Sequence, residues 1–214
     1  KTGLDESASV DLLLRAFDAG VNLVDSSEAY GTESIIGRAL QARERGDIVV
    51  STKKSTRRKE VTPATLMESL DASLQRLQTD VIDLFQFHGL VPGNYHEAVE
   101  RLYPTVQQLQ EQGKIRFIGV TEYFYVDSSH EMLKFALQDD IWDALMVKYG
   151  ILNMTAEQDV LPQARQQNVG VINMSPVRVK LTRPDQLEEI IARWKDQGLL
   201  DADALPKEKP LDFL

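Results

Sequence analysis

The chain has 214 residues, of which 43% are hydrophobic and none is cysteine. This composition can bury a substantial core, so we expect one globular domain spanning residues 1–214. The lack of cysteine excludes thiol nucleophiles, thiolate metal sites and disulfide bonds, and suits a cytoplasmic location. The net charge of −9 disfavours nucleic acid and anionic membranes as partners, and no apolar run reaches the roughly 18 residues of a membrane span.

Apolar segments and helical patterns alternate along the chain. Strands are predicted to begin near Asn22, Ile48, Val81, Ile115, Ala144 and Gly170. Neighbouring starts lie 26, 33, 34, 29 and 26 residues apart, close to the roughly 30 residues of one βα unit. Helices are predicted over residues 10–17, 33–43, 62–77, 96–112, 129–138, 156–167 and 185–195. The alternation indicates a parallel sheet covered by helices.

Two architectures have this alternation. A doubly wound sheet usually has a Gly-rich phosphate-binding turn after an early strand, and neither GxGxxG nor GxxxxGK[ST] occurs in the sequence. A (β/α)8 barrel needs about 250 residues and eight strands, whereas we predict six. We therefore expect an α/β fold, a (β/α)8 TIM barrel that is incomplete in this chain. Its first and last strands would lie outside the sequence, and residues 205–214 would form an irregular tail.

Titratable side chains stand at the ends of three successive predicted strands. The first strand ends at Asp25, the second at Lys53 and the third at His88, and Tyr30 follows Asp25 by five residues. Because the carboxyl ends of parallel strands meet at one rim, we expect these four side chains to converge there. A nearby Asp25 would keep Lys53 charged, and a charged Lys53 would lower the pKa of the Tyr30 phenol.

These groups suit proton transfer to a carbonyl oxygen. With a lowered pKa, Tyr30 would donate the proton, and His88 would orient the carbonyl by a hydrogen bond. The set contains no reductant, so a cofactor must supply the hydride. Taken singly, the four residues have structural alternatives: a packed tyrosine, a core histidine, a surface lysine and a capping aspartate. Their alignment at successive strand ends favours the catalytic interpretation.

The sequence resembles the aldo-keto reductase family. Residues 25–31 (DSSEAYG) fit the family's D-x-x-x-x-Y-G signature, residues 51–53 (STK) fit its strand-end lysine, and His88 fits its strand-end histidine. Residues 113–120 and 170–176 are similar to two later strands of the family. The resemblance implies a (β/α)8 barrel that binds NADP or NAD. It also implies that Tyr30 is the general acid/base, tuned by Lys53 and Asp25, for an aldehyde, ketone or sugar substrate.

The sequence departs from the family's pattern at the cofactor positions. Thr121-Glu122 replaces the usual Ser-Asn that holds the nicotinamide carboxamide, and Met146 replaces a common glutamine. Met174 stands where many members stack an aromatic ring on the nicotinamide. The residues expected at the cofactor site are Asp25, Thr121, Glu122, Met146, Met174 and Ser175. Phosphates would meet Arg178, Lys180 and Arg183, unless these residues belong to a solvated loop.

Several alternatives stay open from the sequence. One function is an NAD(P)-dependent oxidoreductase, and the other is a weak or inactive cofactor-binding regulatory or interaction subunit on the same barrel. The chain could also be a fragment that is unstable alone. The basic residues of segment 53–59 either form a solvated loop or guide an anionic ligand. No HExxH motif occurs, and His96 and His130 have no partner at metal-ligand spacing, so we expect no metal. The substrate, NAD versus NADP, and the oligomeric state are left undetermined.

Overall fold

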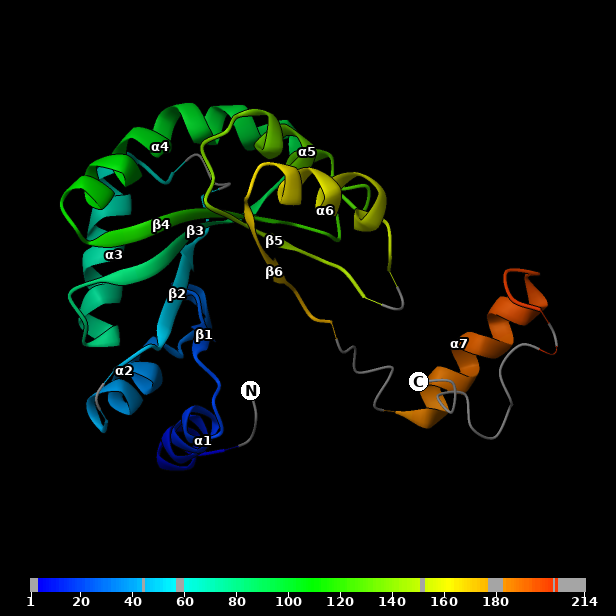
Figure 1. Cartoon of the computed structure of the whole chain (residues 1–214), viewed down its shortest axis with the longest axis horizontal. Coiled ribbons are helices and arrows are strands. Elements are labelled where there is room, and N and C mark those ends of the chain that lie inside the picture. The colour runs from blue at the N-terminus through cyan, green and yellow to red at the C-terminus, as the bar shows by residue number, and fades with distance from the viewer. Residues whose placement is uncertain are drawn as a thin grey trace.

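The computed structural model describes residues 4–43, 45–56, 60–150, 153–176, 183–201 and 203. In this part of the chain, six parallel strands form one sheet whose spatial order matches the sequence order. The strands are β1 (Leu23–Asp25), β2 (Val49–Lys54), β3 (Ile82–Leu90), β4 (Ile115–Glu122), β5 (Ala144–Val147) and β6 (Gly170–Asn173). The sheet curves, and helices cover its convex face (Figure 1). The prediction of an incomplete (β/α)8 barrel is confirmed.

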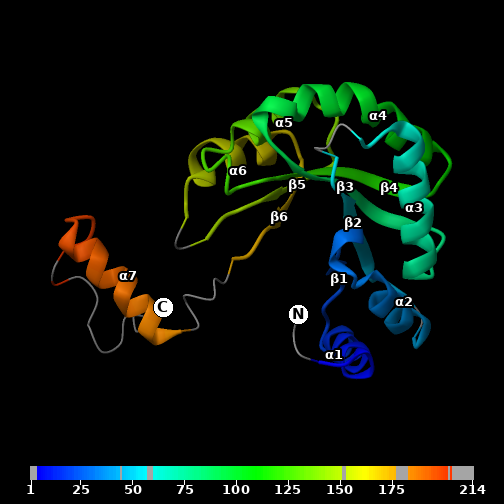
Figure 2. The same ribbon diagram turned by 180° about the vertical axis from the view of Figure 1, so that it is seen from behind.

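A helix connects each strand to the next, as parallel pairing requires, and further helices precede β1 and follow β6. The helices are α1 (Glu6–Asp18), α2 (Glu33–Gln41), α3 (Pro63–Leu77), α4 (Tyr95–Glu111), α5 (Glu131–Gln138), α6 (Ala156–Gln166) and α7 (Pro184–Asp196). Two short 3₁₀ helices, η1 (Glu28–Tyr30) and η2 (Pro92–Asn94), follow β1 and β3. Helix α7 lies to one side of the sheet in both views (Figures 1 and 2).

Local sequence explains where α3 and α5 begin. Thr62 caps α3 by accepting from the backbone N–H of Thr65, and Pro63 occupies the first helical position. Helix α5 begins two residues later than predicted, because His130 has a left-handed backbone with φ 60°. The carboxylate of Asp127 satisfies the first N–H groups of α5, which are those of Glu131 and Met132.

The core lies between the convex face of the sheet and the helices. Outward-facing strand residues such as Val50 and Phe85 pack there with Leu66 and Leu102 of the helices, and all four are buried. Each such side chain stabilises the fold by roughly 1.5–3 kcal/mol. On the concave face, in contrast, the side chain of Phe117 is 49% exposed. Among the described residues, none of the helices combines the length and apolarity required to cross a bilayer.

Strand register places the predicted catalytic residues on the concave face. Asp25 pairs with Ser51, and Lys53 pairs with Gln86. Because side chains alternate between the two faces of a strand, these four residues and His88 point to the same face. The predicted tail at 205–214, the predicted phosphate residues Arg178 and Lys180, and basic residues 57–59 lie outside the described residues.

Candidate active site

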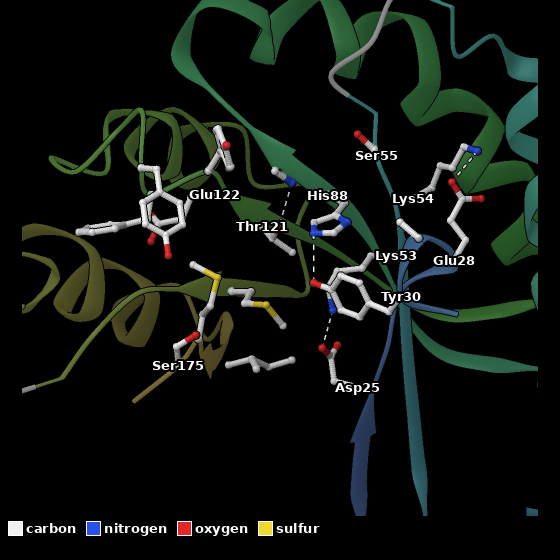
Figure 3. Close-up of a pocket in the computed structure, with 18 of the residues that line it drawn as sticks. Asp25, Glu28, Tyr30, Lys53, Lys54, Ser55, His88, Thr121, Glu122 and Ser175 are labelled. Carbon is white, nitrogen blue, oxygen red and sulfur yellow. Dashed lines mark hydrogen bonds and ion pairs between the residues drawn. The ribbon is translucent and has the colours of Figure 1, made fainter. Parts of the chain in front are cut away.

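A cavity of about 940 Å³ opens at the carboxyl ends of the strands. Every strand contributes to its lining, and all nine predicted catalytic and cofactor residues are part of it. These are Asp25, Tyr30, Lys53, His88, Thr121, Glu122, Met146, Met174 and Ser175. Figure 3 shows Tyr30 and Lys53 on one side of the cavity, with Glu122 and Ser175 on the other. The fold therefore brings together residues that are up to 150 positions apart in the sequence.

Lys53 is buried, and its ammonium has two partners. It forms an ion pair with Asp25 and donates a hydrogen bond to the carbonyl oxygen of Ser26, 2.7 Å away. The other oxygen of Asp25 accepts from Ser51 Oγ at 2.8 Å and from Gln86 Nε2 at 3.2 Å. The sequence did not reveal Ser51 and Gln86 as partners, because only strand pairing places them beside Asp25. These bonds fix the carboxylate that faces Lys53.

The pKa values differ in part from the prediction. Burial lowers the pKa of Lys53 below its usual 10.5, and the carboxylate of Asp25 opposes this shift. The pKa of Tyr30 was expected to be lowered by Lys53, and this prediction is wrong. Burial raises the pKa of Tyr30 above 10.0, and the negative charge of Asp25 raises it further. The ammonium of Lys53 lies 5.3 Å from the centroid of the Tyr30 ring, and its hydrogen bonds go to Asp25 and Ser26.

Tyr30 and His88 lie edge to face across the cavity. Tyr30 Oη is 3.4 Å from Nε2 of His88, and the ring centroids are 5.7 Å apart. On its other side, Nδ1 of His88 is 3.2 Å from Oγ of Ser27. The hydroxyl of Ser27 donates its only proton to the carbonyl oxygen of Lys53, at 3.0 Å. Ser27 must therefore accept from Nδ1–H, and the Nε2 atom of a neutral His88 is then the acceptor for the Tyr30 hydroxyl.

Helix η1, which carries Tyr30, is fixed through Glu28. The carboxylate of Glu28 forms an ion pair with Lys54, at 2.7 Å, and accepts a hydrogen bond from Ser69 of α3. Lys54 is the residue after Lys53 on β2. Glu28 thus links the loop that carries the phenol to the strand that carries the ammonium. The D-x-x-x-x-Y-G pattern does not specify this residue, so the sequence analysis missed it.

The opposite side of the cavity is built around Glu122. One oxygen of the buried carboxylate lies 2.6 Å from Nδ1 of His130, and the other accepts from the backbone N–H of Lys148 at 2.6 Å. The hydroxyl oxygen of Thr121 accepts from the backbone N–H of Gly89 at 2.8 Å. Both residues of the pair that replaces Ser-Asn are therefore engaged within the protein.

The floor of the cavity on this side is apolar. It includes Met146 of β5, Ile172 of β6 and Met174, and the polar side chain of Ser175 follows. Among the described residues, no group of three or more histidine, aspartate or glutamate side chains is arranged to hold a metal ion. The chemistry of the site is therefore that of an acid, an amine, an imidazole and a phenol facing an apolar wall.

Comparison with known proteins agrees with this geometry. The model of the Aldo/keto reductase family matches residues 1–197, and the chain belongs to this family. The NADH-specific methylglyoxal reductase of Escherichia coli K12 is 31% identical over 193 residues, covering 81% of this chain and 58% of its own length. The L-galactose dehydrogenase of Arabidopsis thaliana is 31% identical over 185 residues, covering 82% and 57%.

A solved structure is also similar to this chain. The aldo/keto reductase of Klebsiella pneumoniae, determined in complex with NADP and acetate, superposes with a TM-score of 0.66 at 25% identity. The match covers 90% of this chain and 67% of that one. The chain thus spans less than two thirds of the two curated relatives. The residues that the family model matches, 1–197, include the site described above.

Proposed function

We propose that this chain carries the catalytic site of an NAD(P)-dependent oxidoreductase. The reaction would transfer a hydride between a nicotinamide cofactor and the carbonyl or alcohol of an aldehyde, ketone or sugar. The observation that supports this most is the convergence of Tyr30, Lys53, Asp25 and His88 on one cavity in a member of the aldo/keto reductase family. The proposal includes small-molecule substrates, no nucleic-acid or membrane partner, and a cytoplasmic location.

The residues of the cavity fit a nicotinamide. Met146, Ile172 and Met174 offer an apolar surface to one face of a planar ring, and the hydroxyl of Ser175 lies beside it as a donor and acceptor for an amide. When bound, the cofactor supplies the hydride for carbonyl reduction. NAD and NADP both satisfy this part of the site. The relatives differ in the same way, since one is named NADH-specific and another was solved with NADP.

Tyr30 is proposed as the proton donor to the carbonyl oxygen. Its raised pKa keeps the phenol protonated at neutral pH, so the donor form is fully populated. As a C–H bond forms at the carbonyl carbon, the oxygen gains negative charge and takes the phenolic proton. His88 lies on the same side, and its Nε2 atom, 3.4 Å from Tyr30 Oη, marks where a carbonyl oxygen would be bound. With a carbonyl oxygen in that place, the neutral tautomer of His88 that carries its proton on Nε2 would donate a second hydrogen bond to it.

Lys53 is proposed to stabilise the ionised phenol after proton transfer, and Asp25 is proposed to hold Lys53 charged and in place. The ammonium near the Tyr30 ring favours the phenolate once it forms. Asp25 keeps the buried ammonium charged by opposing the effect of burial on its pKa. Because Asp25 is itself fixed by Ser51 and Gln86, the ammonium has little freedom to move away.

Removal of the phenolic hydroxyl tests the assignment. Tyr30→Phe should reduce turnover of a carbonyl panel by roughly 10²- to 10⁴-fold, the usual contribution of a general acid. Nicotinamide fluorescence quenching should give an unchanged cofactor affinity, since the hydroxyl is not required for the apolar wall. Tyr125→Phe is the matched control, because this tyrosine also lines the cavity but is 82% exposed. Turnover that survives Tyr30→Phe unchanged would reject the enzymatic proposal for this site.

One observation favours a second function. Both oxygens of Glu122 are engaged by His130 and Lys148. Where the usual asparagine offers a free amide to the nicotinamide, this side chain therefore offers no free polar group. A chain that binds the cofactor but places it poorly would act as a regulatory or interaction subunit. Cofactor binding in the wild type without measurable turnover over the carbonyl panel would support this alternative.

A further inference from the structure

Lys148 is a buried lysine that faces backbone rather than solvent. It directly follows β5, and the residue is only 4% exposed. Its ammonium donates a hydrogen bond to the carbonyl oxygen of Met174, at 3.1 Å, and another to the carbonyl oxygen of Ser175. Burial of an ammonium is unfavourable unless such acceptors replace water. The position of this charge therefore depends on two consecutive carbonyl groups at the end of β6.

The backbone that Lys148 contacts is in an unfavourable conformation. Ser175 has φ 51°, in the left-handed region that residues with a Cβ atom rarely adopt. Before it, the N–H of Met174 donates to the carbonyl oxygen of Val147 at 2.8 Å, the last bond between the β5 and β6 ends. A left-handed residue persists only where neighbouring groups determine it. The ammonium of Lys148 is the group that bonds the carbonyl oxygen on both sides of this turn.

The backbone of Lys148 is fixed from the opposite direction. Its N–H donates to Glu122, whose other oxygen bonds His130. Nε2 of His130 lies 2.7 Å from the hydroxyl oxygen of Thr155, and the side chain of Asn153 donates to the carbonyl oxygen of Lys148 at 3.0 Å. Lys148 is thus held by β4 and by the start of α6 while its side chain reaches β6.

The ends of β5 and β6 also approach each other closely. A Cβ atom on Gly150 would lie 3.1 Å from the carbonyl oxygen of Pro176. The backbone N–H of Tyr149 donates to the side chain of Asn173 at 3.2 Å. The turn that contains Ser175 is therefore pressed against the segment that contains Lys148, and the amine of Lys148 reaches the backbone oxygens of this turn.

From this geometry we propose that Lys148 is a positioning residue for the cofactor. It fixes the Met174–Ser175 turn, which forms the apolar and polar wall that the proposed function assigns to the nicotinamide. The inference rests on the proposed function for the identity of the ligand, but the role of Lys148 in fixing the turn does not. Because Lys148 acts through this wall, its loss should weaken cofactor binding more than turnover.

Hydrogen exchange tests the structural part without any cofactor. In Lys148→Met, which keeps an unbranched side chain of similar length, amide exchange of a peptide covering residues 171–176 should become at least 10-fold faster. Peptides covering Asp25 and Lys53 should be unchanged. Lys134→Met is the control. It also removes a lysine from this half of the fold, but this lysine lies on helix α5 and is paired with Glu131 and Asp159 of the outer helices. Equal exchange of residues 171–176 in Lys148→Met and wild type would overturn the proposal.

Cofactor titration tests the functional part. Lys148→Met should raise the dissociation constant of NADPH or NADH about 10-fold by fluorescence quenching, with kcat at saturating cofactor within about 3-fold of wild type. A loss confined to kcat would contradict the positioning role. If the wild type binds neither cofactor, the proposed function fails while the exchange result still decides the role of Lys148.

A second substitution separates positioning from general destabilisation. Ser175→Gly accepts the left-handed backbone without strain. In the Ser175→Gly background, Lys148→Met should therefore weaken cofactor binding less than in the Ser175 background. An undiminished effect in the double variant would show that Lys148 does not act through this turn.

Discussion

The two sides of the cavity are built on different principles. On the β1–β3 side, side chains bond to side chains: Lys53 to Asp25, and Tyr30 to His88. On the β4–β6 side, Glu122 bonds the His130 side chain, but the charged groups also bond to backbone: Glu122 accepts from the N–H of Lys148, and Lys148 donates to two carbonyl oxygens. The first side presents titratable groups to a ligand. The second uses its charged groups to shape a wall.

This difference separates the residues that are available to a ligand from those that support the fold. A charged residue that lines a cavity is not thereby a ligand contact, as Glu122 shows. Its carboxylate is satisfied within the protein, and so is the ammonium of Lys148. In contrast, Tyr30 is 54% exposed and its hydroxyl has one weak partner, His88, among the described residues, so it is available to a substrate.

The largest expected effect is the loss of turnover in Lys53→Met. This change leaves Asp25 without its ammonium and removes the charge that stabilises an ionised Tyr30. Turnover should fall on the order of 10²-fold or more, while circular dichroism and cofactor affinity stay close to wild type. Lys134→Met is the control, because it removes a lysine that is paired with Glu131 and Asp159 on the outer helices. A wild-type rate in Lys53→Met would show that the β1–β3 side of the cavity does not carry the proposed proton transfer.

A change on the opposite side should act on stability instead. Glu122→Ala leaves the N–H of Lys148 and the imidazole of His130 without their partner, and unsatisfied buried groups cost about 3 kcal/mol together. Urea unfolding should show this loss as a lower midpoint. The exposed Glu97→Ala should have little effect. If Glu122→Ala abolished turnover while the midpoint stayed at the wild-type value, Glu122 would take part in the reaction and not only support the fold.

The smallest expected effect concerns the pH dependence of carbonyl reduction. The pKa of Lys53 is lowered from 10.5, and that of Tyr30 is raised from 10.0. As pH rises, Lys53 therefore loses its charge at a lower pH than a free lysine would, and kcat/KM should decline as that charge is lost. The pH profile of Lys53→Met, measured over the same range, should lack this decline. A decline of the same position in the variant would assign it to another group.

The placement of the proposed catalytic residues in one cavity was predictable from sequence because it depends on strand ends. Each of Asp25, Lys53 and His88 terminates or nearly terminates an apolar run, and parallel strands bring such positions to one rim. The helix cap at Thr62 was predictable for a similar reason, since capping depends on neighbours three residues away. In both cases the deciding contacts follow from local pattern and from a rule that applies to every parallel sheet.

The supporting network was not predictable in this way. Gln86 meets Asp25 across two strand pairings, and Lys148 meets Ser175 only because two strand ends approach closely. No local pattern distinguishes these residues from ordinary polar positions. The sign of the Tyr30 pKa shift was also missed, since it depends on burial and on which charge lies nearer in space.

The sequence by itself determined the succession of βα units, the acid, amine, phenol and imidazole at the rim, and the family to which they belong. These features rest on hydrophobic periodicity and fixed spacing, which are properties of a short stretch of chain. Only the tertiary structure decided the partners of each charge, the protonation preferences, and the use of Glu122 and Lys148 as supports. Burial and distance set those quantities, and both arise only when segments far apart in the sequence pack together.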